Sequence, residues 1–409
     1  MSFKSWFPLA LIIFIVALLL DMPIVTLIIF SIVLIYWTAR WWSNKAFDNI
    51  EYTRNFHYTG AFPGEEVAVK IEVENNKILP VSWLKFRDPW QRAVGPVDEE
   101  KLISSHLPHM GNLHNVYSLR WFEKVKRSSQ LKFRARGAYP IGPTKLETGD
   151  LFGIFSKEKT LKNIEYLTVF PSLIPLEDLN LPPDDPFGDR KSRKKIFEDP
   201  SFPMGIRDYR PRDSFRQVHW PATARTGELK VKVFQPTSAQ VLMACMNVST
   251  FPSIWEGYYP ELFEYVLSAT ASILDIGMKD GYQIGLISNG MIANSSRGSR
   301  ISPGSSPRHL SNLFGALAGV TPFIVGPFER FLMSEMPKIP YGATLVVLTA
   351  IIKPELVETL LRIRQHGRRI VLFSFAEELP PEIEGIHTVH LPFKGEKTIN
   401  EFTKNQRAL

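Results

Sequence analysis

The densest group of side chains that could carry chemistry lies in one short stretch between residues 207 and 227. It combines guanidinium, carboxylate, imidazole and aromatic groups: Arg207, Tyr209, Asp213, Arg216, His219, Trp220 and Arg225. A guanidinium binds a carboxylate through two parallel hydrogen bonds, so Asp213 with Arg216 or Arg225 would form a buried ion pair. We expect these residues to form a structural network that joins two domains, and the alternative is a binding surface for a partner protein.

A catalytic role for the same stretch would use His219 as a general base that Asp213 orients. The sequence offers neither an identifiable nucleophile nor a metal partner beside them. We therefore predict no catalytic residues and no enzyme activity, with a membrane-bound hydrolase that uses His219 and Asp213 as the alternative. That alternative requires a pocket around His219 that is open to solvent, whereas a structural network would be closed.

Three histidines that lie close together in the sequence, His106, His109 and His114, raise the question of a metal site. Their spacing does not place them on one face of a regular element, and Pro108 would interrupt a helix there. We expect solvated loop histidines rather than metal ligands, and the sequence assigns them no role.

The composition limits the classes of partner that the chain can have. Its 409 residues suffice for two or three domains, and the formal net charge is +7. The basic residues are scattered, so we expect no nucleic-acid binding and attribute the positive charge to a nearby anionic membrane surface. The single cysteine, Cys245, allows no disulfide within the chain, which fits a reducing compartment.

The first 45 residues have the pattern of a membrane anchor. Asp21 is the only charged residue in residues 5–39, where it separates two apolar runs at 6–20 and 23–39. A bilayer core needs about 20 apolar residues per helix, and both runs are at the short end of that requirement. Two helices joined by a short turn make a hairpin, so we predict a transmembrane helical hairpin over residues 1–45. A cleaved signal peptide and a buried hairpin of a soluble protein are the alternatives.

The distribution of cations gives the orientation of this anchor. Lys4 precedes the first run, Arg40 and Lys45 follow the second, and the turn between the runs has no Lys or Arg. The positive-inside rule then places both ends of the hairpin in the cytoplasm. We therefore predict a multi-pass protein of the plasma membrane, with both termini and the soluble domains cytoplasmic.

Two soluble domains with different periodicities follow the anchor. In residues 50–172 polar and apolar residues alternate in short stretches such as 66–74, which predicts a β-sandwich of immunoglobulin-like architecture. Residues 173–236 are expected to be a linker, Pro-rich and charged at first, that also contains the stretch described above. In residues 237–409 apolar strands alternate with helical patterns, which predicts a Rossmann-like α/β domain with a mostly parallel sheet.

The α/β domain shows the clearest patterns of the chain. Apolar runs occur at 241–248, 344–349 and 369–375, and helical spacings at 260–277, 307–318 and 354–365. Ligand sites of such sheets lie at the carboxyl ends of the strands. The polar residues expected at these ends are Asn247, Ser249, Asn289 and Thr349.

Three motifs occur in order along the chain: Arg136–Pro143, Gly149–Phe155 and Arg207–Gly227. Together they resemble the signatures of the bacterial domain of unknown function 58 family, and the resemblance spans most of residues 1–250. The sequence departs from the family pattern at Leu151, where the family has Pro, at Arg212, where it has Gly, and at Pro221, where it often has Lys.

The resemblance carries expectations for fold and partner. Members of that family carry a von Willebrand factor A-like domain after these motifs, and they are thought to act with AAA+ ATPases of the MoxR type. The resemblance thus implies a von Willebrand factor A-like fold for residues 237–409 and a MoxR-type ATPase as the partner. We expect a membrane-anchored protein-interaction or scaffold component.

The same resemblance bears on a metal ion. A von Willebrand factor A domain binds Mg²⁺ through an Asp-x-Ser-x-Ser turn after its first strand, with a Thr and an Asp from later loops. In the corresponding turn Asn247 replaces the Asp and Phe251 the last Ser, and no carboxylate follows Thr349. Hard cations prefer charged oxygen ligands, so we predict a degenerate site and no cofactor. A weak Mg²⁺ site with Asn247 and Ser249 as ligands is the alternative.

Overall fold

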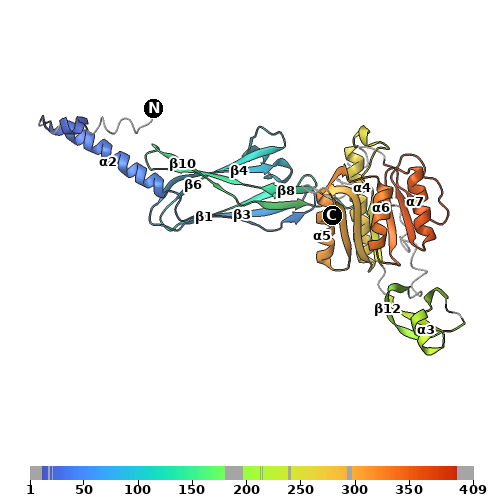
Figure 1. Cartoon of the computed structure of the whole chain (residues 1–409). Coiled ribbons are helices and arrows are strands. Elements are labelled where there is room, and N and C mark those ends of the chain that lie inside the picture. Colours follow the sequence, from blue (N-terminus) through green and yellow to red (C-terminus); the bar gives the residue numbers. More distant parts are fainter. Residues whose placement is uncertain are drawn as a thin grey trace. The chain divides into compact units, whose positions relative to one another are not determined.

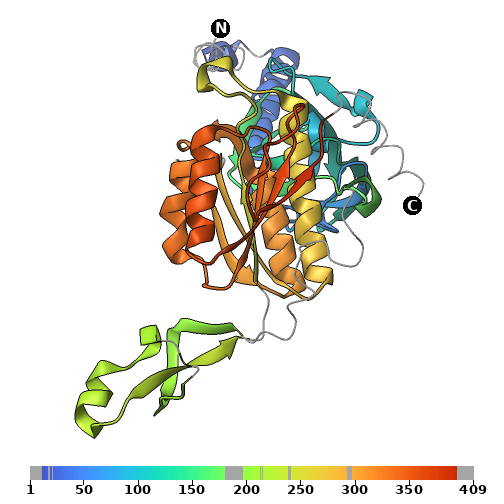
Figure 2. The same ribbon diagram turned by 90° about the vertical axis from the view of Figure 1, so that its right-hand side faces the viewer.

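The computed structural model (Figures 1 and 2) describes residues 12–16, 19–20, 22–179, 197–211, 213, 215–237, 241–292 and 297–393. The chain divides into two compact units, Met1–Val169 and Phe170–Leu409. The first unit contains a long helix followed by β-sheets, and the second alternates strands and helices.

The helix α2, Pro23–Lys45, is long and apolar enough to cross a membrane. Only 6% of its most apolar stretch is buried, so α2 differs from the core helix of a soluble protein, although a signal sequence has the same length and composition. The first predicted run, residues 6–20, lies largely outside the described residues. The structure thus supports one candidate membrane span, and it does not support the predicted multi-pass topology.

The strands of the first unit form three sheets that share one hydrophobic core. They are β1 (Ile50–Phe56), β2 (Gly60–Ala61), β3 (Glu66–Asn75), β4 (Val81–Gln91), β5 (Leu102–Ser104), β6 (Met110–Leu119), β7 (Lys124–Lys132), β8 (Gly137–Ile141), β9 (Thr144–Gly149), β10 (Ser156–Leu161) and β11 (Glu165–Val169). The sheet orders are β1-β3-β7, β10-β9-β4-β6-β5 and β2-β11-β8.

The core of the first unit follows from the alternation in its strands. In β3 the alternate side chains Val67, Val69, Ile71 and Val73 are buried, which confirms the strand predicted at residues 66–74. The β-rich character of this region is therefore confirmed. Its immunoglobulin-like class stays a prediction.

The strand register brings three turns of the first unit to the end at which α2 enters. The pairs that fix this end are Ile50 with Asn75, Val81 with Leu119, and Leu84 with Thr148. Because β1 begins shortly after α2, the β3–β4, β6–β7 and β9–β10 turns all lie at the α2 end. In the first of these turns Lys77 Nζ donates to the carbonyls of Lys45 (2.8 Å), Ala46 (2.5 Å) and Asp48 (2.7 Å), and so binds the end of α2.

The second unit is built around a sheet of order β16-β15-β14-β18-β19-β20, with β17 paired to β15. Its elements are β14 (Val241–Met246), α4 (Pro260–Lys279), β15 (Gln283–Ile292), β16 (Gly298–Gly304), α5 (Pro307–Gly319), β17 (Val320–Ile324), α6 (Phe328–Glu335), β18 (Thr344–Thr349), α7 (Pro354–Gln365), β19 (Arg369–Ser374) and β20 (His387–His390). Pairing is parallel from β15 through β14, β18 and β19 to β20, and β16 and β17 are antiparallel to β15.

Helices cover both faces of this sheet (Figure 2). Every residue of β14 and β18 is buried, which explains their continuous apolar runs. On one face Met243 and Cys245 share a core with Phe328 of α6 and Leu356 of α7. The alternation of strands and helices expected after residue 237 is therefore present.

A two-stranded antiparallel sheet of β12 (Phe197–Asp208) and β13 (Lys230–Thr237) precedes the parallel sheet, with α3 (Trp220–Thr226) between its strands. The sequence predicted a linker in this region. Pro200 and Pro203 interrupt any regular alternation in β12, and the register of the pair shifts on both sides of Pro203. A periodicity argument therefore could not find these strands.

Candidate functional site

The residues grouped between 207 and 227 in the sequence connect β12 to β13. The chain leaves β12 at Asp208, which pairs with Lys230 at the start of β13. The helix α3 ends at Gly227, whose left-handed backbone (φ 73°) favours glycine. None of the α3 residues is buried. We call residues 197–237 the β12–β13 module.

Asp213 is bound by Arg207, whereas the sequence suggested Arg216 or Arg225 as its partner. Arg207 Nη1 donates to Asp213 Oδ2 (2.6 Å) and Nη2 to Oδ1 (2.7 Å), while the Arg210 N–H donates to Oδ2 (2.8 Å). The Arg207 bonds come first among the causes that lower the pKa of Asp213 to about 2. The chain turns back after β12 and so brings Asp213 to that strand, whereas Arg225 lies exposed on α3 and the Arg216 side chain is outside the described structure. Because Arg207 stays 39% exposed, the expected buried pair is instead a half-exposed one.

His219 is the N-cap residue of α3. Its Nδ1 atom accepts a hydrogen bond from the Ala222 N–H (3.1 Å), and its own N–H donates to the Lys230 carbonyl (2.8 Å). Such a cap satisfies one of the free N–H groups in the first turn of a helix. Both oxygens of Asp213 are taken by Arg207, so Asp213 does not orient His219. The pair that the hydrolase alternative requires is not assembled among the described residues.

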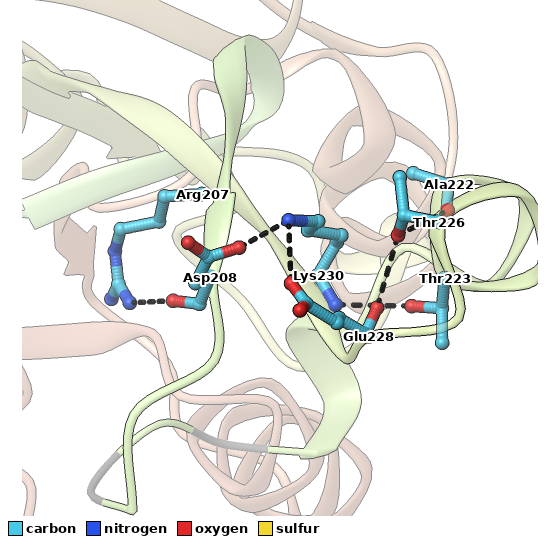
Figure 3. A network of polar contacts seen from close by, with 7 residues as sticks. All are labelled: Arg207, Asp208, Ala222, Thr223, Thr226, Glu228 and Lys230. Carbon is cyan, nitrogen blue, oxygen red and sulfur yellow. Dashed lines mark hydrogen bonds and ion pairs between the residues drawn. The ribbon is translucent and has the colours of Figure 1, made fainter.

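The β12–β13 module also contains a polar network that the sequence analysis missed (Figure 3). Lys230 Nζ binds the Asp208 carboxylate and, at 3.4 Å, Glu228 Oε2. The Lys230 N–H donates to Thr223 Oγ1 (3.1 Å), which ties β13 to α3. The hydrogen bond between Asp208 and Lys230 lowers the pKa of the carboxyl and raises that of the amine. The strand register places Asp208 opposite Lys230, and no local sequence motif predicts this pair.

Aromatic side chains lie exposed on the same module. Phe215 and Trp220 are 65% and 63% exposed, and the Tyr209 ring packs against Phe215 at a centroid distance of 5.4 Å. Arg225 is exposed as well. Trp, Tyr and Arg are the residue types that dominate binding energy between proteins. The module thus presents aromatic and guanidinium groups, while its acids Asp208 and Asp213 are already paired.

At the carboxyl end of the parallel sheet three buried polar side chains bind one another. Asn247 Nδ2 donates to Thr349 Oγ1 (3.0 Å), and Asn289 Nδ2 donates to Asn247 Oδ1 (3.1 Å). Asn289 Oδ1 accepts from the Val248 N–H (3.0 Å), and Asn247 Oδ1 also accepts from the Ser249 N–H (3.1 Å). We call Asn247, Asn289 and Thr349 the amide network; each is at most 6% exposed. The sequence placed these residues at one edge but did not show that they bind each other.

The amide network has little capacity left for a cation. Thr349 Oγ1 donates to the Ile351 carbonyl (2.7 Å) and accepts from Asn247, whose own oxygen already accepts two hydrogen bonds. Neither Ser249 nor Phe251 adds a charged oxygen. In the part of the chain that the structure describes, no group of three or more His, Cys, Asp or Glu residues is placed to hold a metal ion. The residues present therefore do not fit Mg²⁺.

The loop that follows β14 carries a second set of exposed aromatic side chains. Phe251, Trp255 and Tyr258 are exposed, and Trp255 is 95% exposed. Thr250 Oγ1 accepts from the Tyr259 N–H (2.8 Å) and so fixes the base of the loop. This edge of the sheet combines a closed polar interior with an aromatic surface.

The three histidines near residue 110 do not come together as ligands. His106 and His109 are exposed, as expected for loop residues. His114 instead lies half-buried in β6, where burial and then the charges of Lys85 and Arg87 lower its pKa.

A buried ion cluster in the first unit was not anticipated from the sequence. Arg54 Nε binds Glu165 Oε2 (2.9 Å), and Arg54 Nη1 lies 3.6 Å from Asp88 Oδ1. The Tyr52 hydroxyl donates to Asp88 Oδ2 (2.7 Å), and burial followed by the Asp88 charge raises the pKa of Tyr52. The Arg54 and Asp88 side chains are almost fully buried, so the cluster joins strands and is closed to a substrate.

The first two motifs shape loops of the first unit. Gly142 has a φ of 108°, and a Cβ there would lie 2.4 Å from the Asn163 carbonyl oxygen, so the position requires glycine. The Asp150 carboxylate accepts from the N–H groups of Phe152 (2.7 Å) and Phe155 (2.5 Å). The second motif is therefore a turn held by its own carboxylate.

Within the described residues, the fold and these contacts define one candidate membrane helix, a β-sheet unit and a unit with a mostly parallel sheet. Residues 205–407 match the family model described as "Protein of unknown function DUF58". The resemblance inferred from the motifs is confirmed to this extent, although only the third motif lies within the matched residues. The chain is also 23% identical over 340 residues to "Uncharacterized protein YeaD" of Bacillus subtilis (strain 168), an alignment that covers 82% of this chain and 78% of the relative.

Similar solved structures add little to this comparison. The sporulation control protein Spo0M of Bacillus subtilis is 14% identical, with 32% of this chain and 53% of that chain covered and a TM-score of 0.20. A type II cohesin domain from the cellulosome of Acetivibrio cellulolyticus is 15% identical, with 30% and 95% covered and a TM-score of 0.21. At such TM-scores neither structure supports an argument about this chain, and neither establishes a von Willebrand factor A fold.

Proposed function

We propose that this chain is a membrane-anchored protein-interaction component that binds a partner protein through the β12–β13 module. The observation that carries the proposal is the exposure of Phe215 and Trp220 on a module whose carboxylates Asp208 and Asp213 are internally paired. Exposed aromatic rings and guanidinium groups contribute most strongly to binding between proteins. Aromatic rings do so because they bury a large area with few rotatable bonds.

The carboxyl end of the parallel sheet is proposed as a second docking face. Its exposed loop carries Trp255 and Phe251, and the amide network fixes the base of that loop through the N–H groups of Val248 and Ser249. A fixed loop loses less entropy on binding than a mobile one. In this proposal the face works without Mg²⁺ or another cofactor.

The proposed partner is an AAA+ ATPase of the MoxR type, which the family resemblance implies. We place the soluble units on the cytoplasmic side of the plasma membrane, because Arg40 and Lys45 lie at the carboxyl end of α2. Residues 237–409 are proposed to have a von Willebrand factor A-like fold. Catalysis and nucleic-acid binding are not part of the proposal.

An affinity pull-down of the full chain from detergent-solubilised membranes tests the proposal, with and without Mg²⁺. The variant is Phe215→Ala with Trp220→Ala, and the matched control is Tyr166→Ala, which removes an exposed aromatic ring from the first unit. We expect the wild type and the control to recover an AAA+ ATPase in both metal conditions and the double variant to lose it. Undiminished recovery by the double variant would refute the docking module. Absence of the ATPase from every sample would refute the partner.

A further inference from the structure

We propose that the first unit is partly embedded in the membrane surface by three loops at its α2 end. Six exposed apolar side chains of these loops form what we call the apolar rim: Ile78, Trp121, Phe122, Leu151, Phe152 and Ile154. Their exposed fractions range from 45% to 76%. The apolar rim is proposed to insert into a lipid bilayer, at the level between the headgroups and the acyl chains. The inference rests on the proposed anchoring of α2 in the membrane.

The strand register gathers the apolar rim at one end of the unit. Ile78 lies in the β3–β4 turn, Trp121 and Phe122 in the β6–β7 turn, and the other three residues in the β9–β10 turn. All three turns lie at the end where α2 enters. Scattered exposed apolar residues are ordinary on soluble proteins, but a set gathered at one end marks an interaction surface.

Two contacts join the β9–β10 turn and β10 to α2, the helix that meets this end of the first unit in Figure 1. The Phe155 ring, next to Ile154, meets the Tyr36 ring of α2 edge-on at a centroid distance of 5.5 Å. Lys157 Nζ donates to Asn44 Oδ1 near the end of the helix (2.7 Å). The rim is thus continuous with the surface of the candidate membrane span.

The position of Tyr36 along α2 gives the depth of the β9–β10 turn. A span of about 20 residues that begins at Pro23 ends near Trp42. Tyr36 precedes Trp42 by roughly 9 Å at the rise of an α-helix. Trp37, Trp41 and Trp42 mark this part of α2 as interfacial, because tryptophan is enriched at the membrane–water boundary. A turn that contacts Tyr36 therefore reaches the interface when α2 spans the bilayer.

The charges of the loops also suit a lipid surface. The Asp150 carboxylate accepts N–H groups of its own turn, and Glu123 Oε2 accepts from the Arg120 N–H (2.6 Å). Both carboxylates thus stabilise the conformation of their own loops through backbone hydrogen bonds. Lys159 and the Arg120 side chain are exposed nearby and can meet anionic headgroups.

Depth-dependent fluorescence quenching of the full chain in vesicles tests the inference. Single cysteines that replace Phe152 and Trp121 in the rim, Leu27 in α2, and Tyr58 are labelled with an environment-sensitive dye. Tyr58 follows β1 at the opposite end of the unit and serves as the control. Cys245 is fully buried, and burial raises the pKa of its thiol, so it does not react in the folded protein. The vesicles contain phosphatidylcholine and phosphatidylglycerol with a nitroxide quencher on the acyl chain.

We expect the dyes at residues 27, 121 and 152 to lose fluorescence to the lipid quencher and the dye at 58 to keep it. Quenching at 27 without quenching at 121 and 152 overturns the embedded rim and leaves the anchor intact. No quenching at 27 overturns the anchor itself. Iodide in the aqueous phase serves as a second quencher. If the dyes at residues 121 and 152 are protected from both the lipid quencher and iodide, protein covers the rim, which also overturns the inference.

Discussion

The amide network and the β12–β13 module differ in where their hydrogen bonds lead. Asn247, Asn289 and Thr349 are buried and bind each other, so the network faces inward. The module pairs Asp208 and Asp213 locally and leaves Phe215 and Trp220 exposed. In the sequence both regions are rich in polar residues of functional types. Burial and hydrogen-bond partners therefore distinguish a buried structural network from an exposed binding surface. Residue type alone does not distinguish them.

The largest effect is expected where a closed network carries charge, in the Arg54 cluster. Asp88→Ala removes the fully buried carboxylate that partners the Arg54 guanidinium. Breaking such a buried pair costs about 3–5 kcal/mol of unfolding free energy. Asp98→Ala is the control, because Asp98 pairs with Lys101 on an exposed surface at 3.5 Å. Thermal unfolding of both variants in detergent measures the difference. Equal unfolding midpoints would show that the cluster does not stabilise the first unit.

A smaller loss is expected from the neutral amide network. Asn289→Ala leaves the Val248 N–H without its partner and removes one of the two hydrogen bonds that Asn247 Oδ1 accepts, which costs about 1–3 kcal/mol. Ser249→Ala is the control, because only the backbone N–H of Ser249 contacts the network. Hydrogen exchange of β14 and β15 gives the measurement. Unchanged exchange in Asn289→Ala would mean that the network does not stabilise the sheet edge.

A local effect is expected from His219, the cap of α3. His219→Ala should destabilise the helix by about 0.5–2 kcal/mol, the usual cost of losing an N-cap side chain. His219→Asn should restore protection, because asparagine is a strong N-cap residue. Exchange of the Ala222 amide reports both changes. Failure of asparagine to rescue, together with loss of an enzymatic turnover, would favour the hydrolase alternative.

The smallest effect is expected at the exposed pair of Arg207 and Asp213. The pKa of Asp213 is lowered to about 2, so the pair stabilises the fold fully above the ordinary value of 3.8 and loses that contribution as the pH falls through 2. Arg207→Ala should move the carboxyl titration upward toward 3.8. Nuclear magnetic resonance of the isotope-labelled side chain measures it. A titration that does not move would mean that another group holds Asp213.

Sequence periodicity sufficed where burial alone decided the element. The runs at β14 and β18 are apolar because both faces of the sheet are covered, and α7 has the predicted bounds of residues 354–365. The β12–β13 pair was missed because prolines break its pattern and its register is irregular. The strand β16 was also not predicted, since its Gly, Ser and Arg residues give no apolar run.

The candidate site was foreseen only in part, because its partners are set by three-dimensional geometry. The sequence named Asp213 and His219 but did not identify Arg207 as a partner of the carboxylate, since only the turn after β12 brings these two residues together. It placed Asn247 and Thr349 at one edge of the sheet, since parallel strands end together. It could not reveal that their amide and hydroxyl groups saturate each other.

The Lys77 contact makes the junction between α2 and the first unit a mechanical coupling. Four residues, 46–49, separate the helix from β1, and Lys77 binds carbonyls at both ends of this short connection. Such a junction has almost no slack, so a pull or a twist applied to the sheets is transmitted to the helix instead of being absorbed by a linker. In the proposed membrane setting, a force applied to the first unit would therefore tilt or rotate α2.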